Sequence, residues 1–315
     1  VANSTEGTVS IVDLASGRVA ARIFLGEGSW PFALALKPGL VTPSGQGGEK
    51  IYVTSFFSRA SKFNNGGETD DSRTGRVFVI ANRKLAGTVN LKPFRCFPFP
   101  AGSGQKIFGF PNLLNSISVK GKFGYVTSVG ASPQRAVNFV ANTQAFVQTF
   151  NTETDTEIDA GAVNLNEPVE EEAVKGLFFN TPWGVALSST GDNGLVLSAA
   201  SNLAVKVTMD ATTGVPTIKG AATPTSSVGI RRIPVGKNPR GVVFSSDGNL
   251  AYVHNYISRD LSVVGLTAER VVRTIRLTPP PNNARDVQIL HGEELYNTSL
   301  GESTVDPNAL NKNRR

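Results

Sequence analysis

Residues Pro239 to Asn255 read PRGVVFSSDGNLAYVHN and have the pattern of a β-hairpin. Two runs of apolar and small residues flank Ser245-Ser246-Asp247-Gly248, a sequence suited to a tight turn. Proline fixes the backbone where the first run begins, and a short polar tag ends the second run. The stretch therefore predicts two antiparallel strands joined by a tight turn.

The same hairpin recurs along the chain. Its second strand, with the polar tag, returns at residues 51–55, 124–128 and 195–198, and Val1 to Ser4 resembles a fifth copy that lacks its beginning. A proline turn precedes each full copy, and these turns contain Pro31, Pro111, Pro182 and Pro239. A repeat of this kind indicates an architecture built from equivalent units.

A second hairpin is expected after each tag. The clearest copy runs from Thr8 to Ile23 around the polar turn 13–17, and further copies begin near residues 76, 145, 204 and 261. Two hairpins make a four-stranded antiparallel sheet that buries its faces against neighbouring sheets, as in a β-propeller. We predict an all-β propeller of about five blades, whose ring is completed by sequence outside this chain. The last blade is expected to have a first hairpin but no second. A solenoid or a sandwich is the alternative fold.

Several of these segments carry a family resemblance. Gly7 to Asp13, Ile23 to Gly26, Pro31 to Ala35 and Ile233 to Asn255 together resemble the YVTN-type β-propeller repeat. The resemblance covers most of residues 1–277, which we predict to be the propeller domain. It implies the fold and no particular activity.

The tags lie about 70, 70 and 57 residues apart, whereas a blade needs about 40 to 45. Most of the excess falls in connections that emerge on one face, namely residues 56–74, 92–109, 129–143 and 166–181, while 37–49 and about 214–229 fall elsewhere. Long loops often carry function, so we expect a partner to dock on this face. The expected docking residues are Trp30, Phe110, Trp183 and Arg240. Packing between blades is the alternative role for these side chains.

Charge and composition exclude some classes of function. The chain has 31 basic and 25 acidic residues, but the basic residues are scattered and form no patch interleaved with aromatic residues, so nucleic-acid binding is not expected. No apolar run approaches the roughly 18 residues of a transmembrane segment. With two histidines and one cysteine, a catalytic triad or a three-histidine metal centre has few ways to form.

One acidic loop is a candidate Ca²⁺ site. Glu68, Asp70 and Asp71 follow a glycine turn and place three carboxylates close together in the sequence. Ca²⁺ prefers several oxygen ligands from a flexible loop. The alternative is a solvated polar loop, because the segment lacks the alternating spacing of a standard calcium loop.

The C-terminal part breaks the repeat. A proline linker begins at Thr278, and residues 286–297 have the pattern of a short amphipathic helix. The segment from Gly292 to Asn297, Gly-Glu-Glu-Leu-Tyr-Asn, resembles the start of a c-type di-haem domain of the cytochrome c peroxidase-like class. The resemblance implies that residues 278–315 begin a haem domain, with haem c bound beyond this chain. The chain itself has no Cys-x-x-Cys-His motif, so no cofactor is expected within it.

Three functions therefore remain open. The first is a non-catalytic docking platform of a secreted or periplasmic c-type cytochrome or di-haem peroxidase-like protein, whose partner is a haem domain or another redox protein. The second is an enzyme of the propeller lactonase or lyase type with a central site. The third is a surface or adhesive propeller that assembles with copies of itself.

Overall fold

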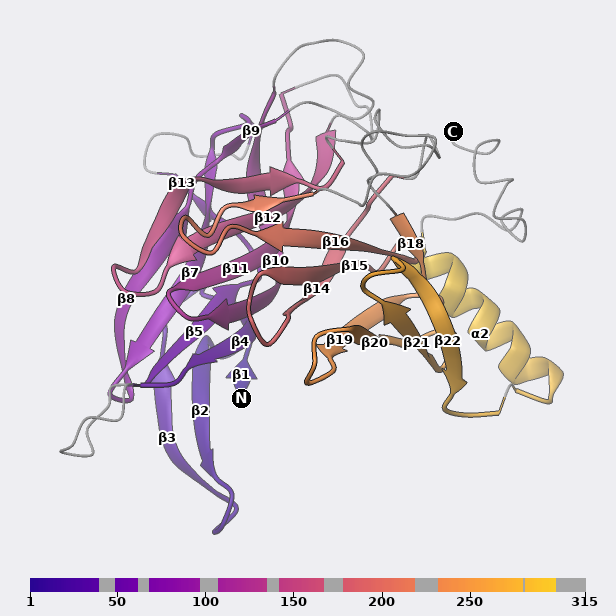
Figure 1. The fold of residues 1–315 in the computed structure, drawn as a ribbon. Coiled ribbons are helices and arrows are strands. Elements are labelled where there is room, and N and C mark those ends of the chain that lie inside the picture. Colours follow the sequence, from indigo (N-terminus) through magenta and orange to yellow (C-terminus); the bar gives the residue numbers. More distant parts are fainter. Residues whose placement is uncertain are drawn as a thin grey trace.

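The computed structural model describes residues 1–39, 49–61, 68–96, 107–134, 142–166, 178–218, 232–279 and 281–298, and within them the strands form five antiparallel sheets (Figure 1). The first sheet holds β1 (Ala2–Asn3), β2 (Thr8–Asp13) and β3 (Arg18–Phe24). The second holds β4 (Pro31–Lys37), β5 (Lys50–Ser55), β6 (Arg59–Ala60), β7 (Arg73–Ala81) and β8 (Lys84–Leu91). The third holds β9 (Phe94–Cys96), β10 (Ile107–Lys120), β11 (Phe123–Ala131), β12 (Thr143–Asn151) and β13 (Thr156–Asn164).

The fourth sheet holds β14 (Pro182–Leu187), β15 (Asn193–Ser198), β16 (Leu203–Met209), β17 (Pro216–Thr217) and β18 (Arg232–Pro234). The fifth holds β19 (Pro239–Phe244), β20 (Leu250–Asn255), β21 (Asp260–Gly265) and β22 (Arg270–Arg276). One helix, α2 (Ala284–Asn297), follows the last strand. No helix of the described residues is long and apolar enough to cross a membrane.

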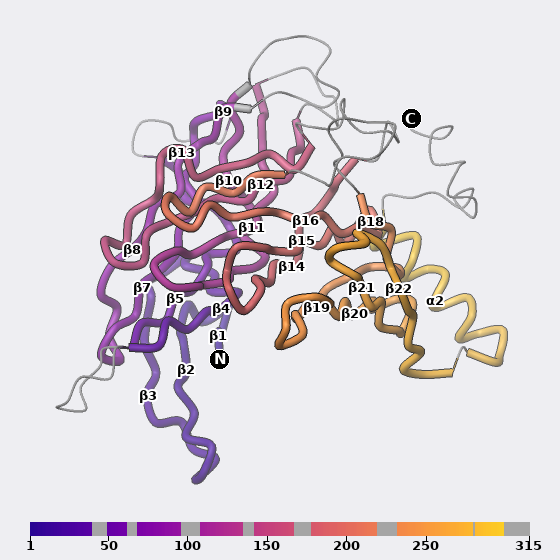
Figure 2. The backbone as a smooth tube through the Cα atoms, viewed as in Figure 1, coloured from indigo at the N-terminus to yellow at the C-terminus, as the bar shows by residue number. Residues whose placement is uncertain are grey.

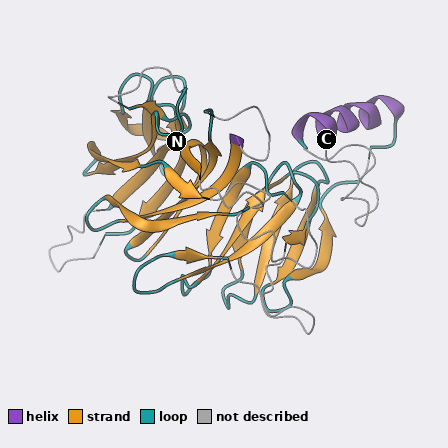
Figure 3. Ribbon diagram, turned by 90° about the horizontal axis from the view of Figure 1, so that it is seen from above, coloured by secondary structure: helices purple, strands orange, loops and turns teal. Residues whose placement is uncertain are grey.

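The sheets are the blades of a β-propeller, as the repeats predict. They follow one another in chain order, and one strand from each of the second to fifth sheets, β4, β10, β14 and β19, packs beside the next (Figure 2). We call these four the inner strands. Seen from above, the strands gather into sheets that lie side by side, and the C-terminal helix stands beside them (Figure 3). The four tag segments are β5, β11, β15 and β20, each paired with an inner strand.

The prediction of an incomplete last blade is wrong. In the fifth blade β21 pairs with β22, so both hairpins are present. The fourth strand, RVVRTIR, lacks a clear strand pattern in the sequence, because it is the outermost strand and most of its side chains face solvent. In the first blade, by contrast, the described residues supply three strands, and β1 occupies the place of the tag strand.

The outer strand of the fourth blade is split. β18 pairs with the start of β16 and β17 pairs with its end. The insertion expected at about 214–229 therefore interrupts this outer strand, and residues 219–231 lie outside the described part.

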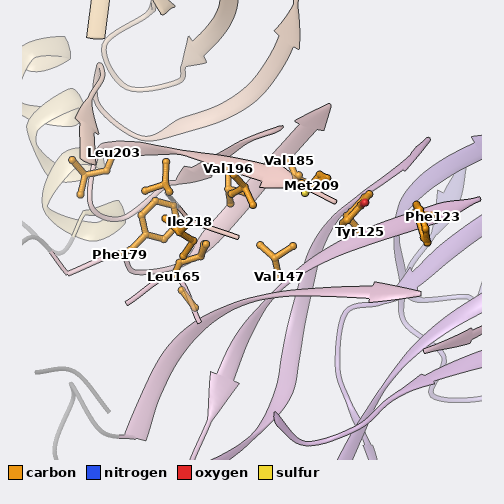
Figure 4. Packing of buried hydrophobic residues seen from close by; sticks show 13 residues of the cluster. Phe123, Tyr125, Val147, Leu165, Phe179, Val185, Val196, Leu203, Met209 and Ile218 are labelled. Carbon is orange, nitrogen blue, oxygen red and sulfur yellow. The ribbon is translucent and has the colours of Figure 1, made fainter. Parts of the chain in front are cut away.

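The blades hold together through apolar layers between neighbouring sheets. Between the third and fourth blades, buried side chains of β11 and β12 face those of β14, β15 and β16 (Figure 4). Tyr125, Val147 and Val196 are at most 2% exposed. Burial of such alternating positions is the main stabilising contribution in a stacked-sheet fold.

A polar contact joins the second and third blades. Tyr52 of β5 is fully buried, and its hydroxyl donates hydrogen bonds to Asp155 Oδ1 at 2.7 Å and to the Thr152 carbonyl at 3.0 Å. Lys50 Nζ lies 2.7 Å from Asp155 Oδ2. Burial, followed by the hydrogen bond to Asp155, raises the pKa of the Tyr52 hydroxyl well above its ordinary value.

We expect Tyr52→Phe to lower the free energy of unfolding by about 2 kcal/mol, because a hydrogen bond to a charged acceptor is lost between two blades. Urea unfolding measures this change. Tyr252→Phe is the matched control, because Tyr252 has the equivalent position in β20 and its hydroxyl has no hydrogen-bond partner among the described residues. Equal destabilisation by both variants would contradict the prediction.

Candidate partner-docking site

Strand register shows which residues of the blades are equivalent. Each inner strand pairs one apolar residue with a valine of its tag strand, and these pairs are Leu34 with Val53, Ile117 with Val126, Val185 with Val196, and Val242 with Val253. The residue two positions earlier in each inner strand lies at an equivalent position, toward the same end of the propeller. These residues are Phe32, Asn115, Trp183 and Arg240, which we call the inner ring.

Phe110 does not belong to the inner ring. Trp30, Thr181 and Asn238 have positive φ values of 42°, 51° and 53° just before their inner-strand prolines, and in the third blade the equivalent residue is Leu113, with φ 50°. The turn of this blade is thus three residues later than Pro111 suggests. Phe110 lies in an extension of β10 and is 4% exposed, so its side chain is packed inside the protein. It cannot meet a partner in this arrangement.

The members of the inner ring contact one another across blades. The Phe32 and Trp183 rings meet edge to face with centroids 6.1 Å apart. The guanidinium of Arg240 lies 4.7 Å from the centroid of the Trp183 ring, a cation–π contact. Asn115, which is 5% exposed, donates from Nδ2 to the Pro182 carbonyl at 2.9 Å. The ring therefore connects the second to fifth blades at one end of their inner strands.

Aromatic residues that follow the tags extend this ring. Phe56 lies 4.8 Å from Phe32 between ring centroids, and Tyr256 occupies the equivalent place beside Arg240, 4.9 Å from its guanidinium. The Phe57 ring packs edge to face on Phe56, with centroids 4.8 Å apart.

Trp30 is the last member of this row of contacting aromatic residues, and its ring packs edge to face on Phe57. Trp30, Phe57 and Tyr256 are each 41% to 45% exposed. Partly exposed aromatic residues around an arginine are the composition of protein-binding hot spots.

The C-terminal helix is fastened to the inner ring by its last turn. Arg240 Nη2 donates to Asn297 Oδ1 at 3.2 Å, and Asn238 Nδ2 donates to the Asn297 carbonyl at 3.3 Å. Lys237 Nζ lies 2.7 Å from Glu294 Oε2. No residue of α2 is buried, so these polar contacts hold the helix rather than an apolar face.

A cavity of about 300 Å³ lies between the end of α2 and the inner ring, and Trp183, Arg240 and Tyr296 contribute to its wall. Four apolar side chains of α2, Val287, Ile289, Leu295 and Tyr296, are each 48% to 90% exposed. The helix thus carries apolar side chains that the described part of the propeller does not cover. Such exposed apolar groups on a fastened element are typical of an interaction surface.

We expect Asn297→Ala to loosen α2 on the propeller, because the hydrogen bonds from Arg240 and Asn238 end on this residue or on the backbone that it orders, and only the Lys237–Glu294 contact remains of these three. Amide hydrogen exchange in residues 284–297 should accelerate, while the free energy of global unfolding changes by less than about 1 kcal/mol. Gln288→Ala, on the exposed part of the helix, is the control. Unchanged exchange in Asn297→Ala would show that the helix is held by other contacts.

The predicted Ca²⁺ ligands lie in the connection between β5 and β7. Asp70 is 8% exposed and exchanges hydrogen bonds with Gln134 of the third blade: its amide donates to Gln134 Oε1 at 3.2 Å, and its Oδ1 accepts from the Gln134 amide at 3.0 Å. Asp71 Oδ1 accepts from the Thr69 hydroxyl at 2.9 Å. Within the described residues, no three His, Cys, Asp or Glu side chains gather as a metal site would require. Ca²⁺ binding by Glu68, Asp70 and Asp71 stays a prediction.

The inner strands carry mainly apolar, small and amide side chains. β4, β10, β14 and β19 contain no histidine, aspartate or glutamate. The two histidines lie on separate elements, His254 in β20 and His291 in α2.

Comparison with known proteins supports the fold. No family model and no curated protein matches the sequence. A periplasmic gluconolactonase of Pseudomonas aeruginosa is 14% identical with a TM-score of 0.50, and the match covers 89% of this chain and 67% of that one. A protein from Desulfotomaculum acetoxidans described as functionally unknown is also 14% identical with a TM-score of 0.50, over 91% of this chain and 69% of that one. Hydrazine synthase of Kuenenia stuttgartiensis is 16% identical with a TM-score of 0.42, and the match covers 84% of this chain and 78% of that one. At these identities the likeness is one of fold.

Proposed function

We propose that this chain is the non-catalytic propeller of a secreted or periplasmic c-type cytochrome or di-haem peroxidase-like protein. In this proposal the inner ring and α2 form the face on which the haem domain or another redox partner docks. The location is proposed from the same sequence resemblance that suggests the haem domain.

The position of α2 is the observation that carries the proposal. The segment that resembles the start of a haem domain, Gly292 to Asn297, is the last turn and a half of this helix. Its final residue is bound to Arg240 of the inner ring. The helix therefore meets the propeller at an end where aromatic residues and an arginine have the composition of a hot spot. A haem module joined to α2 would meet this face at high effective concentration.

The alternative of a propeller lactonase or lyase needs acid, base or metal-binding groups near the central axis. The four inner strands contain no histidine, aspartate or glutamate, so such groups would have to come from other segments. A self-assembling propeller would use the same exposed aromatic residues, and the experiment below separates it from the proposal.

The test starts from the natively isolated protein, with its intact mass and visible spectrum. The proposal predicts a Soret band and a mass above the 33.3 kDa of this chain. A mass of 33.3 kDa without a chromophore would overturn the haem proposal. If light scattering of that protein then showed an assembly state that depends on concentration, the self-assembling alternative would be favoured.

The docking face is tested in the haem-containing protein with Trp183→Ala. Loss of the indole removes the contacts to both Phe32 and Arg240, so limited proteolysis between propeller and haem domain should become faster by about tenfold. Phe108→Ala is the matched control, because Phe108 is 40% exposed and also contacts an arginine, Arg95, but lies outside the inner ring. Equal effects of the two variants would place docking elsewhere.

A further inference from the structure

A second, separate cavity lies between the first and second blades. It has a volume of about 600 Å³, within the range of small-molecule sites. Three arginines line it, Arg59 of β6 with Arg73 and Arg76 of β7. Trp30 and Phe57 form an aromatic part of the wall, and the exposed carboxylate of Glu27 is also among the lining groups.

Arg76 is the buried member of the three. It is 9% exposed, and its Nη2 donates to the Gly28 carbonyl at 2.8 Å and to Ser55 Oγ at 3.3 Å. Its Nε is buried without a hydrogen-bond partner in the described structure. Burial lowers the pKa of Arg76, and the neighbouring charge of Arg59 lowers it further. A buried guanidinium with an unused donor is costly unless an anion completes its hydrogen bonds.

The other two arginines also lack an acidic partner. Arg73 Nη1 donates to the Ser58 carbonyl at 3.3 Å, and Arg59 is exposed on the two-residue strand β6. Among the described residues, no carboxylate lies within ion-pair distance of any of the three guanidinium groups. In the β6–β7 pairing Arg59 stands opposite Thr74, on the same face as Arg76 two residues further along β7, and Arg73 stands opposite Ala60.

We propose that this cavity binds a small-molecule oxyanion, a carboxylate or phosphate that carries a planar apolar group. The arginines hold the oxyanion, because planar guanidinium forks match the geometry of carboxylate and phosphate. The edge-to-face pair of Trp30 and Phe57, with centroids 5.6 Å apart, contacts the planar group. No residue of the inner ring lines the cavity, although Trp30 and Phe57, which extend that ring, contribute to its wall.

Isothermal titration of this chain with inorganic phosphate, benzoate, phenyl phosphate and benzyl alcohol tests the site. Phenyl phosphate should bind most tightly and benzyl alcohol should not bind. Arg59→Gln and Arg73→Gln avoid the buried Arg76 and should each weaken phenyl phosphate binding by about tenfold. Trp30→Leu should reduce the preference for phenyl phosphate over phosphate. Arg22→Gln, an exposed arginine of β3 outside the cavity, should leave all affinities unchanged.

The outcomes separate the proposal from its competitors. Unfolding curves of the free variants should match that of the original chain, so that lost affinity reports the site and not lost folding. Equal weakening by Arg22→Gln and Arg73→Gln would indicate attraction by overall positive charge and overturn the proposal. Absence of phosphate, benzoate and phenyl phosphate binding at millimolar concentration would also overturn it. If only benzoate binds, the ligand class narrows to carboxylates, and if only the phosphates bind, it narrows to phosphates.

Discussion

Gly124→Ala is expected to lower the free energy of unfolding by about 3 kcal/mol, because the new methyl group would overlap a buried aromatic ring. Gly124 of β11 stands directly opposite Phe150 of β12, and a Cβ atom at position 124 would meet the Phe150 ring. The ring cannot retreat, because Phe150 is fully buried and packs on Tyr52 of the second blade with centroids 5.0 Å apart. The substitution therefore disturbs the packing between the second and third blades.

Chemical denaturation measures this effect, and two further variants isolate its cause. Gly87→Ala is the control, because a Cβ at this position of β8 meets no atom within 4 Å. Phe150→Leu in the Gly124→Ala background should recover stability relative to the sum of the single changes, with a coupling of at least about 1 kcal/mol. A Gly124→Ala variant as stable as Gly87→Ala would show that the ring has room to move.

The hairpins could be predicted because their signals are local. A proline turn, an Asp-Gly or Thr-Gly turn and a polar tag each act within a few residues of their position, so the inner and tag strands agree with the sequence. The outermost strand β22 carries no such signal, because its side chains mostly face solvent. The helix α2 was also predictable, since a proline linker precedes it and Asn283 accepts a hydrogen bond from the Asp286 amide as its N-cap.

The candidate site could be predicted only in part. Trp183 and Arg240 directly follow an inner-strand proline, and the same rule would have identified Phe32. Asn115 gives no such signal, because Leu114 stands where the other blades have proline, and the nearby Pro111 leads to Phe110 instead. The error arises because equivalence between blades is set by strand register, which becomes visible only when the bulge between Asn112 and Ser116 is known.

The arginine cavity could not be predicted from the sequence. Arg59 and Arg73 lie within the insertion 56–74, and their proximity depends on the short pairing of β6 with β7. Arg76 directly precedes the apolar run Val77 to Ala81 of β7. Its burial depends on the connection from the first blade, whose Gly28 carbonyl it binds. Sequence reasoning places these residues on one hairpin but does not show that they share a cavity with Trp30.

Glu157→Gln is expected to remove a pH-dependent loss of stability. Glu157 of β13 lies where the third blade meets the end of β8, and it accepts hydrogen bonds at 2.9 Å from the Lys92 amide and from Gln148 Nε2. Burial raises its pKa from 4.5 to about 7 despite these two donors. Below pH 4.5 the carboxyl is protonated in both the folded and unfolded states, so the folded state keeps its full stability.

As the pH rises from 4.5 to about 7, the unfolded state releases this proton first, so the folded state loses stability, and above that range the loss is constant. One pKa unit corresponds to about 1.4 kcal/mol, so the loss is at most about 3 kcal/mol. Glutamine is neutral at every pH and still accepts from the Lys92 amide. The free energy of unfolding of Glu157→Gln minus that of the original chain should therefore be larger above pH 7 than near pH 5, by about 2 kcal/mol.

Urea unfolding on both sides of this pH range measures the difference, with Glu153→Gln as the control. Glu153 is exposed in the turn before the same strand, so its replacement should shift stability equally at both pH values. Gln148 donates to Glu157, and the new amide nitrogen would meet a donor, which lowers the stability of the variant by a similar amount at each pH. This cost is the same at both pH values, so it does not affect the change in the free energy of unfolding between them. If Glu157→Gln changed the free energy of unfolding equally on both sides of this pH range, the pKa of Glu157 would be the same in the folded and unfolded states. Burial would then not destabilise the charged carboxylate.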